Sequence, residues 1–177
     1  MASFTDRIIG AAMLDVRTYE EVEADKGAMG QAMTLVVLQS VAAGIGAILT
    51  GGITGMIIGV VGALLGWFIW AFVIFLVGTK LLPEPQTRSD MGELLRTIGF
   101  ASAPGLLLFL AIIPILGGLI SLAVSIWMLA AMVIAVRQAL DYESTALAIG
   151  VCLTGWLVLV FASLFLTVII SAALMMA

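Results

Sequence analysis

Four charged residues near the ends of uncharged stretches are the side chains best suited to bind a ligand. Arg96 and Arg137 flank one such stretch, and Asp141 and Glu143 follow shortly after Arg137. Guanidinium groups bind phosphates and carboxylates through paired hydrogen bonds, so this cluster could bind a lipid phosphate or a partner. The same residues could instead pair with one another or extend toward lipid headgroups. Both interpretations are open from the sequence.

Combinations of residues for catalysis or metal binding are missing. The chain has no His and one Cys, Cys152, which nearly excludes the usual zinc and haem sites. We find no paired carboxylates, no nucleophile beside a base and no phosphate-binding glycine loop near water. The net charge of −4 does not suggest nucleic-acid binding. We therefore expect no enzyme, no cofactor, no metal and no nucleic-acid partner, and no small-molecule substrate is indicated.

The distribution of charge predicts the fold class. The 7 basic and 11 acidic residues all lie in segments 6–26, 80–96 and 137–143, and the apolar stretches between these segments are uncharged. A charge at the bilayer centre costs about 2.5–3.5 kcal/mol on insertion scales, and a spanning helix needs about 20 apolar residues. The sequence therefore predicts an all-α polytopic membrane protein with five transmembrane helices. Six spans are the alternative, because the last stretch is long for one span and short for two.

The predicted spans form one membrane domain, 28–177, behind an N-terminal segment, 1–27. They cover about residues 28–49, 54–77, 97–113, 119–136 and 146–171. With this arrangement all 7 basic residues lie on one side, which the positive-inside rule makes cytoplasmic together with the N-terminus. We expect an integral protein of a prokaryotic plasma membrane, with a lipid bilayer as its surroundings.

The N-terminal segment predicts a short amphipathic helix over residues 3–16. This helix could lie in the headgroup region or cover the cytoplasmic ends of the bundle. Two pairs of residues spaced as in a capping box predict further helix starts, Thr18 with Glu21 and Asp90 with Glu93. The apolar face of the first helix contains Phe4, Ile8, Ile9, Ala12, Met13 and Val16.

Glycines of the second predicted span lie on one side of the helix. At 100° per residue they fall within an arc of about 80°, which gives a smooth face where another helix can approach closely. This face could bind a partner or a second copy, or it could pack within the chain against Ser40 and Gly44 of the first span. The glycines are Gly51, Gly55, Gly59, Gly62 and Gly66.

Two prolines predict breaks in the third span. Pro104 removes a backbone hydrogen bond and should kink or interrupt the helix near residues 100–103, where Ser102 could bond a freed carbonyl. Pro114 lies at the exit of the span, before a turn that contains Gly117 and Gly118.

Several short motifs resemble the Yip-domain family of small membrane proteins. They are RTIGFASAP at 96–104, IPILG at 113–117, Trp127, Val136 with Arg137, STALAIGV at 144–151, and TYEEV at 18–22 followed by Asp25. The last of these is similar to the segment before the first span in prokaryotic members. The resemblance implies five spans, a cytoplasmic N-terminus and a non-enzymatic protein. Eukaryotic members of the family that the chain resembles are associated with vesicle traffic, membrane shaping and binding of Rab-type GTPases.

The functional hypothesis is a membrane organiser or accessory subunit. It would bind a membrane-protein partner, or form a homo-oligomer, through helix faces and its cytoplasmic surface. The alternative is a small transporter or channel for a neutral or lipid-like solute. This alternative requires a continuous polar path around Gln39, Ser125 and the break at Pro104.

Overall fold

The computed structural model describes residues 2–46 and 48–176, with side-chain surroundings for residues 2–45, 52–165 and 167. The described residues form helices and turns without strands, and five of the helical segments are long and apolar enough to cross a membrane. The prediction of an all-α protein with five spans and an N-terminal helix is therefore confirmed. The candidate spans are Lys26–Ile45, Gly52–Leu81, Met91–Ile112, Gly117–Ala139 and Thr145–Phe165.

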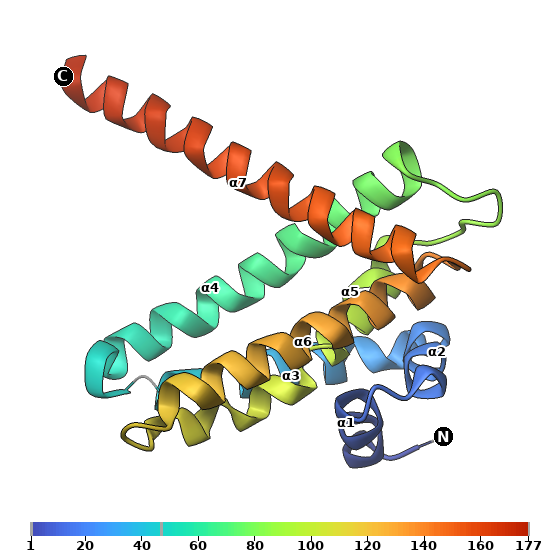
Figure 1. Ribbon diagram of the computed structural model, residues 1–177, viewed down its shortest axis with the longest axis horizontal. Coiled ribbons are helices and arrows are strands. Elements are labelled where there is room, and N and C mark those ends of the chain that lie inside the picture. Colours follow the sequence, from blue (N-terminus) through green and yellow to red (C-terminus); the bar gives the residue numbers. More distant parts are fainter. Residues whose placement is uncertain (1, 47, 177) are drawn as a thin grey trace.

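The helical elements follow one another with short connections (Figure 1). The α-helices are α1 (Phe4–Ala12), α2 (Val16–Ala24), α3 (Met29–Gly46), α4 (Ile48–Leu76), α5 (Met91–Phe100), α6 (Gly117–Ala139) and α7 (Thr145–Met176). Three other segments are the 3-10 helices η1 (Lys26–Ala28) and η3 (Ala103–Ile112) and the π-helix η2 (Val77–Leu81).

Local sequence explains most of the helix boundaries. The predicted capping box is present at the start of α5. The Asp90 carboxylate accepts a hydrogen bond from the Glu93 backbone amide at 2.9 Å, and the Glu93 carboxylate accepts one from the Asp90 backbone amide at 2.7 Å. The predicted start of α2 at Thr18 is wrong, because Asp15 caps a helix that begins at Val16. Asp15 accepts from the Arg17 amide and so occupies the capping role earlier in the chain.

The third span is interrupted where Pro104 stands. Helix α5 ends at Phe100, and η3 begins at Ala103 with Pro104 in its first turn. The Ser102 hydroxyl donates to the Gly99 carbonyl at 2.6 Å and so satisfies one carbonyl at the break. After Ile112 the chain turns through Pro114 and Ile115, whose φ is 70°, into α6.

The stretch after residue 144 forms one continuous helix, α7, which supports five spans rather than six. Helix α4 begins at Ile48, and the second candidate span begins at Gly52, two residues before the predicted start near residue 54. Within α4, Gly52 has a non-helical φ of 59°, which glycine adopts without steric cost. The helix therefore bends at Gly52, between the first two predicted spans.

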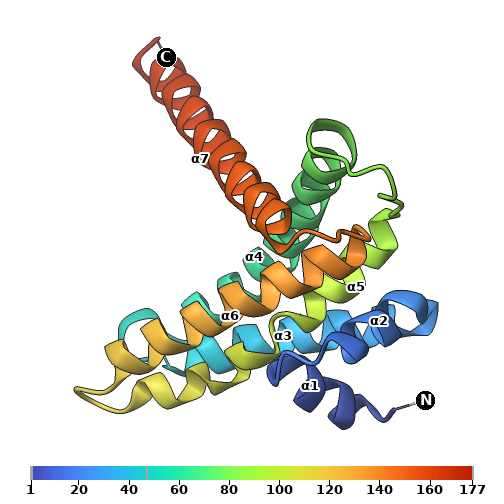
Figure 2. The same cartoon turned by 45° about the vertical axis from the view of Figure 1, so that its right-hand side comes forward.

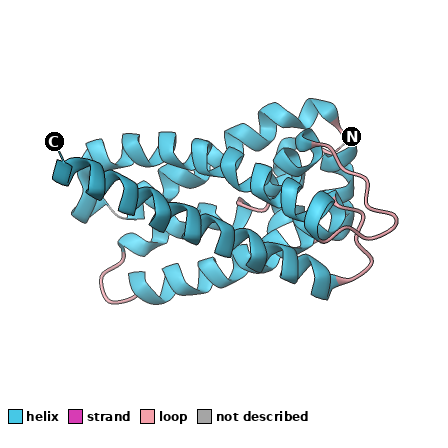
Figure 3. Ribbon diagram, turned by 90° about the horizontal axis from the view of Figure 1, so that it is seen from above, coloured by secondary structure: helices cyan, strands magenta, loops and turns pink. Residues whose placement is uncertain are grey.

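Helices α3, η3 and α6 pack side by side, and α5 continues this layer (Figures 1 and 2). Helix α4 runs back beside α3, and α7 crosses α4 near Gly155 and Ile74 before it projects from the bundle. The loops 82–90 and 140–144 lie at the same end as α2 and the N-terminus (Figure 1), and Figure 3 shows several loops gathered at the end marked N. We call this the charged end, because the charged segments of the sequence gather there.

The protein core is concentrated toward the charged end. One cluster contains Leu94, Leu140 and Val151, and a second contains Tyr19, Leu35 and Phe100, all buried. The exposure of α6 changes along its length, because the part after Ala130 is buried or half-buried whereas most of the part before it is exposed. Lipid can solvate apolar side chains, so the exposed part needs no protein cover.

Candidate functional site: the N-terminal hairpin and the glycine face

A buried arginine links the first three α-helices. Arg7 is only 2% exposed, and its Nη2 atom lies 2.8 Å from both Glu21 Oε1 and Asp25 Oδ2. Its Nη1 atom donates to Gln31 Oε1 at 2.9 Å. Glu21 lies in α2, Asp25 directly follows α2, and Gln31 lies at the start of α3. One guanidinium therefore joins α1 to both α2 and α3. We call α1 and α2 with their connecting turn, residues 3–25, the N-terminal hairpin.

The electrostatics of this group favour its charged form. Burial opposes the charge on Arg7, but the hydrogen bonds that it donates to Glu21 and Asp25, together with the charges of these carboxylates, raise its pKa. The bonds to Arg7 in turn hold the pKa of Glu21 and that of Asp25 below their ordinary values. The ion pairs therefore persist through the neutral range.

A second buried arginine holds the end of α2. Arg96, in α5, is 4% exposed, and its Nε atom donates to the carbonyls of Val22 at 3.0 Å and Glu23 at 3.1 Å. Its Nη2 atom also donates to the Glu23 carbonyl. The last carbonyls of a helix lack intrahelical partners, and a cation there is favoured by the helix dipole. Arg96 therefore caps α2 from another element.

Two aromatic donors hold the end of α1 in the same way. The Trp127 indole, in α6, donates to the Ala12 carbonyl at 2.7 Å, and the Tyr19 hydroxyl donates to the Ala11 carbonyl at 3.0 Å. The rings of Phe4 and Phe100 meet edge to face with centroids 6.3 Å apart. These contacts hold α1 against α2, α5 and α6.

Sequence reasoning missed Arg7 and left the surroundings of Trp127 undecided. A signal for Arg7 was present, because on a helical wheel it lies beside Phe4 and Ala11, which face the bundle. An arginine within the inward face of a helix needs acidic partners, and Glu21 and Asp25 stand close by in the sequence. For Trp127 no comparable local signal exists, because its partner is a backbone carbonyl 115 residues earlier.

Acidic side chains also gather at the charged end. Burial raises the pKa of Glu23 to about 7, with further contributions from the charges of Asp141 and Glu93 and a smaller one from Glu20, whereas Arg96 opposes the shift. These groups come from α2, α5 and the turn after α6. The Glu23 carboxyl therefore changes its charge near neutral pH.

The four residues of the predicted charged cluster all lie at the charged end but make separate contacts. Arg96 faces the carbonyls of α2, and the Arg137 Nε atom donates to the Tyr142 carbonyl at 3.2 Å. The Glu143 amide donates to the Glu84 carboxylate at 2.9 Å, and Asp141 occupies a turn with a φ of 53°. None of the ion pairs in the described part of the chain joins two of these four side chains.

The predicted glycine face of α4 is open. At Gly55, Gly59, Gly62 and Gly66 a Cβ atom would meet nothing within 4 Å, and all four residues are exposed. The surroundings of Gly51 lie outside the described residues. The close approach of α3 and α4 occurs elsewhere, where a Cβ on Gly44 would stand 2.6 Å from Met56 Cγ.

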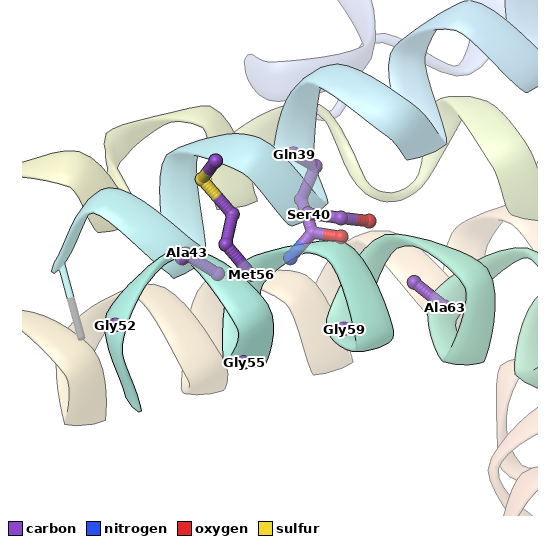
Figure 4. A pocket seen from close by; sticks show the side chains of 9 residues that line it. Gln39, Ser40, Ala43, Gly52, Gly55, Met56, Gly59 and Ala63 are labelled. Carbon is purple, nitrogen blue, oxygen red and sulfur yellow. The ribbon is translucent and has the colours of Figure 1, made fainter. Parts of the chain in front are cut away.

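A crevice of about 310 Å³ separates α3 from the glycine face (Figure 4). Gln39, Ser40 and Ala43 line it from α3, and Gly55 and Gly59 line it from α4. A second cavity of about 210 Å³ shares Gln39 and Ala63 with it and reaches Gly66 and Ser102.

Two of the three parts of the predicted transport path come together. Gln39 lines both cavities, Ser102 at the break before Pro104 lines the second, and a Cβ on Gly105 would overlap Gln39 Cγ. Ser125 is exposed on α6 and lines neither of these two cavities. The polar path that the transporter alternative requires therefore does not extend to Ser125 through these two cavities.

Comparison with known proteins identifies one similarity. The model of a protein family described as the Yip1 domain matches residues 15–175 of the chain. No curated protein and no solved structure matches it. The matched region includes α2, Arg96, the break at Pro104 and all five candidate spans.

Proposed function

Because this match extends over most of its length, the chain belongs to the Yip1 domain family, and we propose that it is a non-enzymatic membrane scaffold or accessory subunit. The motif resemblance found in the sequence is thereby confirmed as to family. In this proposal the glycine face of α4, Gly55 to Gly66, binds a helix of another membrane protein or of a second copy. The charged end lies in the cytoplasm of a prokaryotic cell, because all 7 basic residues belong to its segments.

The observation that carries the proposal is the contrast between two groups of glycines. The fold uses Gly99 and Gly155 for its own close helix contacts, since a Cβ there would lie 2.7 Å from Ala32 Cβ and 2.9 Å from Ile74 Cδ1, respectively. Gly55, Gly59, Gly62 and Gly66 of α4 have no such neighbours among the residues whose side chains the structure describes. Helices in lipid associate by close backbone approach at small residues, so an unused face of this kind suits lateral association.

Association can be tested by adding bulk to the face. Gly59→Leu and Gly62→Leu should abolish crosslinking to the partner or second copy in native membranes, with little change in the thermal unfolding midpoint. Gly118→Leu is the matched control, because a Cβ at Gly118 also meets nothing within 4 Å but lies at the start of α6. Crosslinked products identified by mass spectrometry give the readout. Recovery of the monomer alone from the unaltered chain would refute the proposal.

Sidedness has a separate test. A cysteine at Gly118, in a chain that also carries Cys152→Ala, should react with an impermeant thiol reagent added outside intact cells. A reaction that occurs only after the membrane is opened would place this turn in the cytoplasm and contradict the proposed orientation.

A further inference from the structure

The outward side of the N-terminal hairpin carries apolar side chains that no described residue covers. Met13 is 74% exposed and Ile9 is 51% exposed, one turn apart along α1, and Val16 at the start of α2 is exposed beside them. The inward side of the same helix carries Arg7 and is held by its ion pairs. The outward side of α1 also carries Thr5 and Asp6, both exposed, and the inward side also carries Phe4, Ile8 and Ala11. The apolar part of the outward side is therefore its C-terminal end, Ile9 and Met13.

The depth of α1 is set by its bonds to the bundle. The carbonyl of Ala12, the last residue of α1, accepts a hydrogen bond from Trp127. Trp127 lies 12 residues before Ala139, the last residue of α6. At about 1.5 Å per residue it is about 18 Å from that end of α6. Phe4 contacts Phe100, about 14 Å into α5 by the same rise per residue. Helix α1 therefore lies beside the bundle rather than on top of it, and its axis is steeply inclined to α6 (Figures 1 and 2).

The exposed side of α1 continues the lipid-facing surface of α6. Ile126, Trp127 and Leu129 are exposed on the uncharged part of α6, next to the point where Trp127 binds Ala12. Met13 directly follows Ala12, so its side chain stands at the edge of this surface. A helix that is bonded to a membrane span at this depth has the same surroundings as the span, so its exposed side chains contact lipid.

The charged groups at the edge of this surface fit the boundary with the headgroups. Arg17 follows Val16 and has an 89% exposed side chain, which contacts Asp15 at 3.4 Å. A long arginine side chain in this place can lay its stem along acyl chains while its guanidinium reaches a phosphate. Asp6 lies about two turns before Met13 on the same face of α1, is exposed as well, and forms the polar end of this face.

We propose that α1 is an in-plane membrane helix that contacts phospholipid through Ile9, Met13 and Val16, with Arg17 at the level of the phosphates. Arg7 fixes the rotation of the helix by pairing inward. The partner is the phospholipid monolayer at the charged end. The inference needs the spans but not the partner-binding role of the glycine face, so the two can fail separately.

Spin labels can measure the depth of this face. Single cysteines replace Met13, Ile126 and Glu20 in full-length chains that also carry Cys152→Ala. Each is labelled with a nitroxide and reconstituted in nanodiscs of phosphatidylcholine and phosphatidylglycerol. Ile126 serves as the lipid-facing control and Glu20, exposed on α2, as the water-facing control. Collision with oxygen reports lipid, and collision with a water-soluble nickel chelate reports water.

The label at Met13 should give an oxygen-to-nickel ratio close to that at Ile126 and several-fold above that at Glu20. A ratio equal to that at Glu20 would overturn the inference, because α1 would then face water. A label at Met13 that neither reagent reaches would overturn it as well, because another protein segment would cover the face. Deuterium exchange of α1 amides in the labelled chains, unchanged from the unlabelled chain, would show that the hairpin is still docked.

Discussion

The buried guanidinium of Arg7 should control whether the N-terminal hairpin stays docked. Truncation in Arg7→Ala removes its bonds to Glu21, Asp25 and Gln31 at once. Removing one partner of a buried ion pair costs about 3–5 kcal/mol, and we expect about 2–3 kcal/mol because both carboxylates are partly exposed and regain water. This corresponds to an increase of about 30–150-fold in the population of the undocked hairpin.

Hydrogen–deuterium exchange on the full chain in nanodiscs measures this population directly. Amides of α1 and α2 should exchange faster by the stated factor, whereas those of α6 around Ala131, which is fully buried, should not change. Arg17→Ala is the matched control, because it removes the same side chain from the same hairpin. Its contact with Asp15 is exposed and is worth less than about 0.5 kcal/mol.

Equal exchange in Arg7→Ala and Arg17→Ala would refute the reasoning. It would mean that the apolar contacts of the hairpin hold it in place and that the ion pairs add nothing. Faster exchange throughout the chain would also contradict it, because the prediction is local opening rather than loss of the fold.

Three further predictions concern the same architecture. The pKa of Glu23 is raised from 4.5 to about 7, so the folded chain binds this proton more tightly than the unfolded chain. Docking should therefore weaken as the pH rises from about 4.5 through 7, and Glu23→Gln should flatten this dependence in exchange measurements at pH 5 and 8. Gly99→Ala should destabilise the fold by about 1–3 kcal/mol, because its Cβ would overlap α3, whereas Gly30→Ala, in open space, should not lower the unfolding midpoint. Trp127→Phe keeps an aromatic ring but loses the 2.7 Å hydrogen bond to the Ala12 carbonyl, which should cost about 1 kcal/mol. The deuterium exchange rate of the α1 amides should therefore rise about fivefold. Trp156→Phe is the control and should leave this rate unchanged, because the Trp156 side chain is exposed.

The membrane spans could be predicted because the bilayer imposes a constraint that acts on each stretch separately. Charge is expensive throughout the hydrocarbon layer, so its absence from a long segment marks a span whatever the neighbouring helices do. The capping box of Asp90 and Glu93 is similarly local, since both partners lie within one turn. The same rule failed at Thr18 because Asp15 offered a competing cap three residues earlier, where the chain leaves α1 through Leu14 at a φ of 62°.

The candidate site was harder to predict because its partners are distant in the sequence or are backbone atoms. Arg96 was recognised as a functional candidate, but its acceptors are carbonyls more than 70 residues earlier, which no pattern of side chains announces. Asp141 and Glu143 are close enough to Arg137 in the sequence to form ion pairs with it, yet the Arg137 Nε atom donates to the Tyr142 carbonyl within the turn. Tertiary packing decides between such acceptors, and a charge pattern only restricts them to one end of the bundle.

The glycines show why a pattern of small residues does not by itself identify a contact. Gly55 and Gly59 have the spacing that favours close helix approach, but α3 meets α4 at Gly44 instead, where the Met56 side chain fills the space. Gly99 belongs to no such pattern and yet lies against the backbone of α3, where its Cβ would be 3.3 Å from Ala32 Cα. Spacing shows where a helix can be approached, whereas the breaks and bends of the chain decide which of those places the fold uses and which it leaves free for a partner.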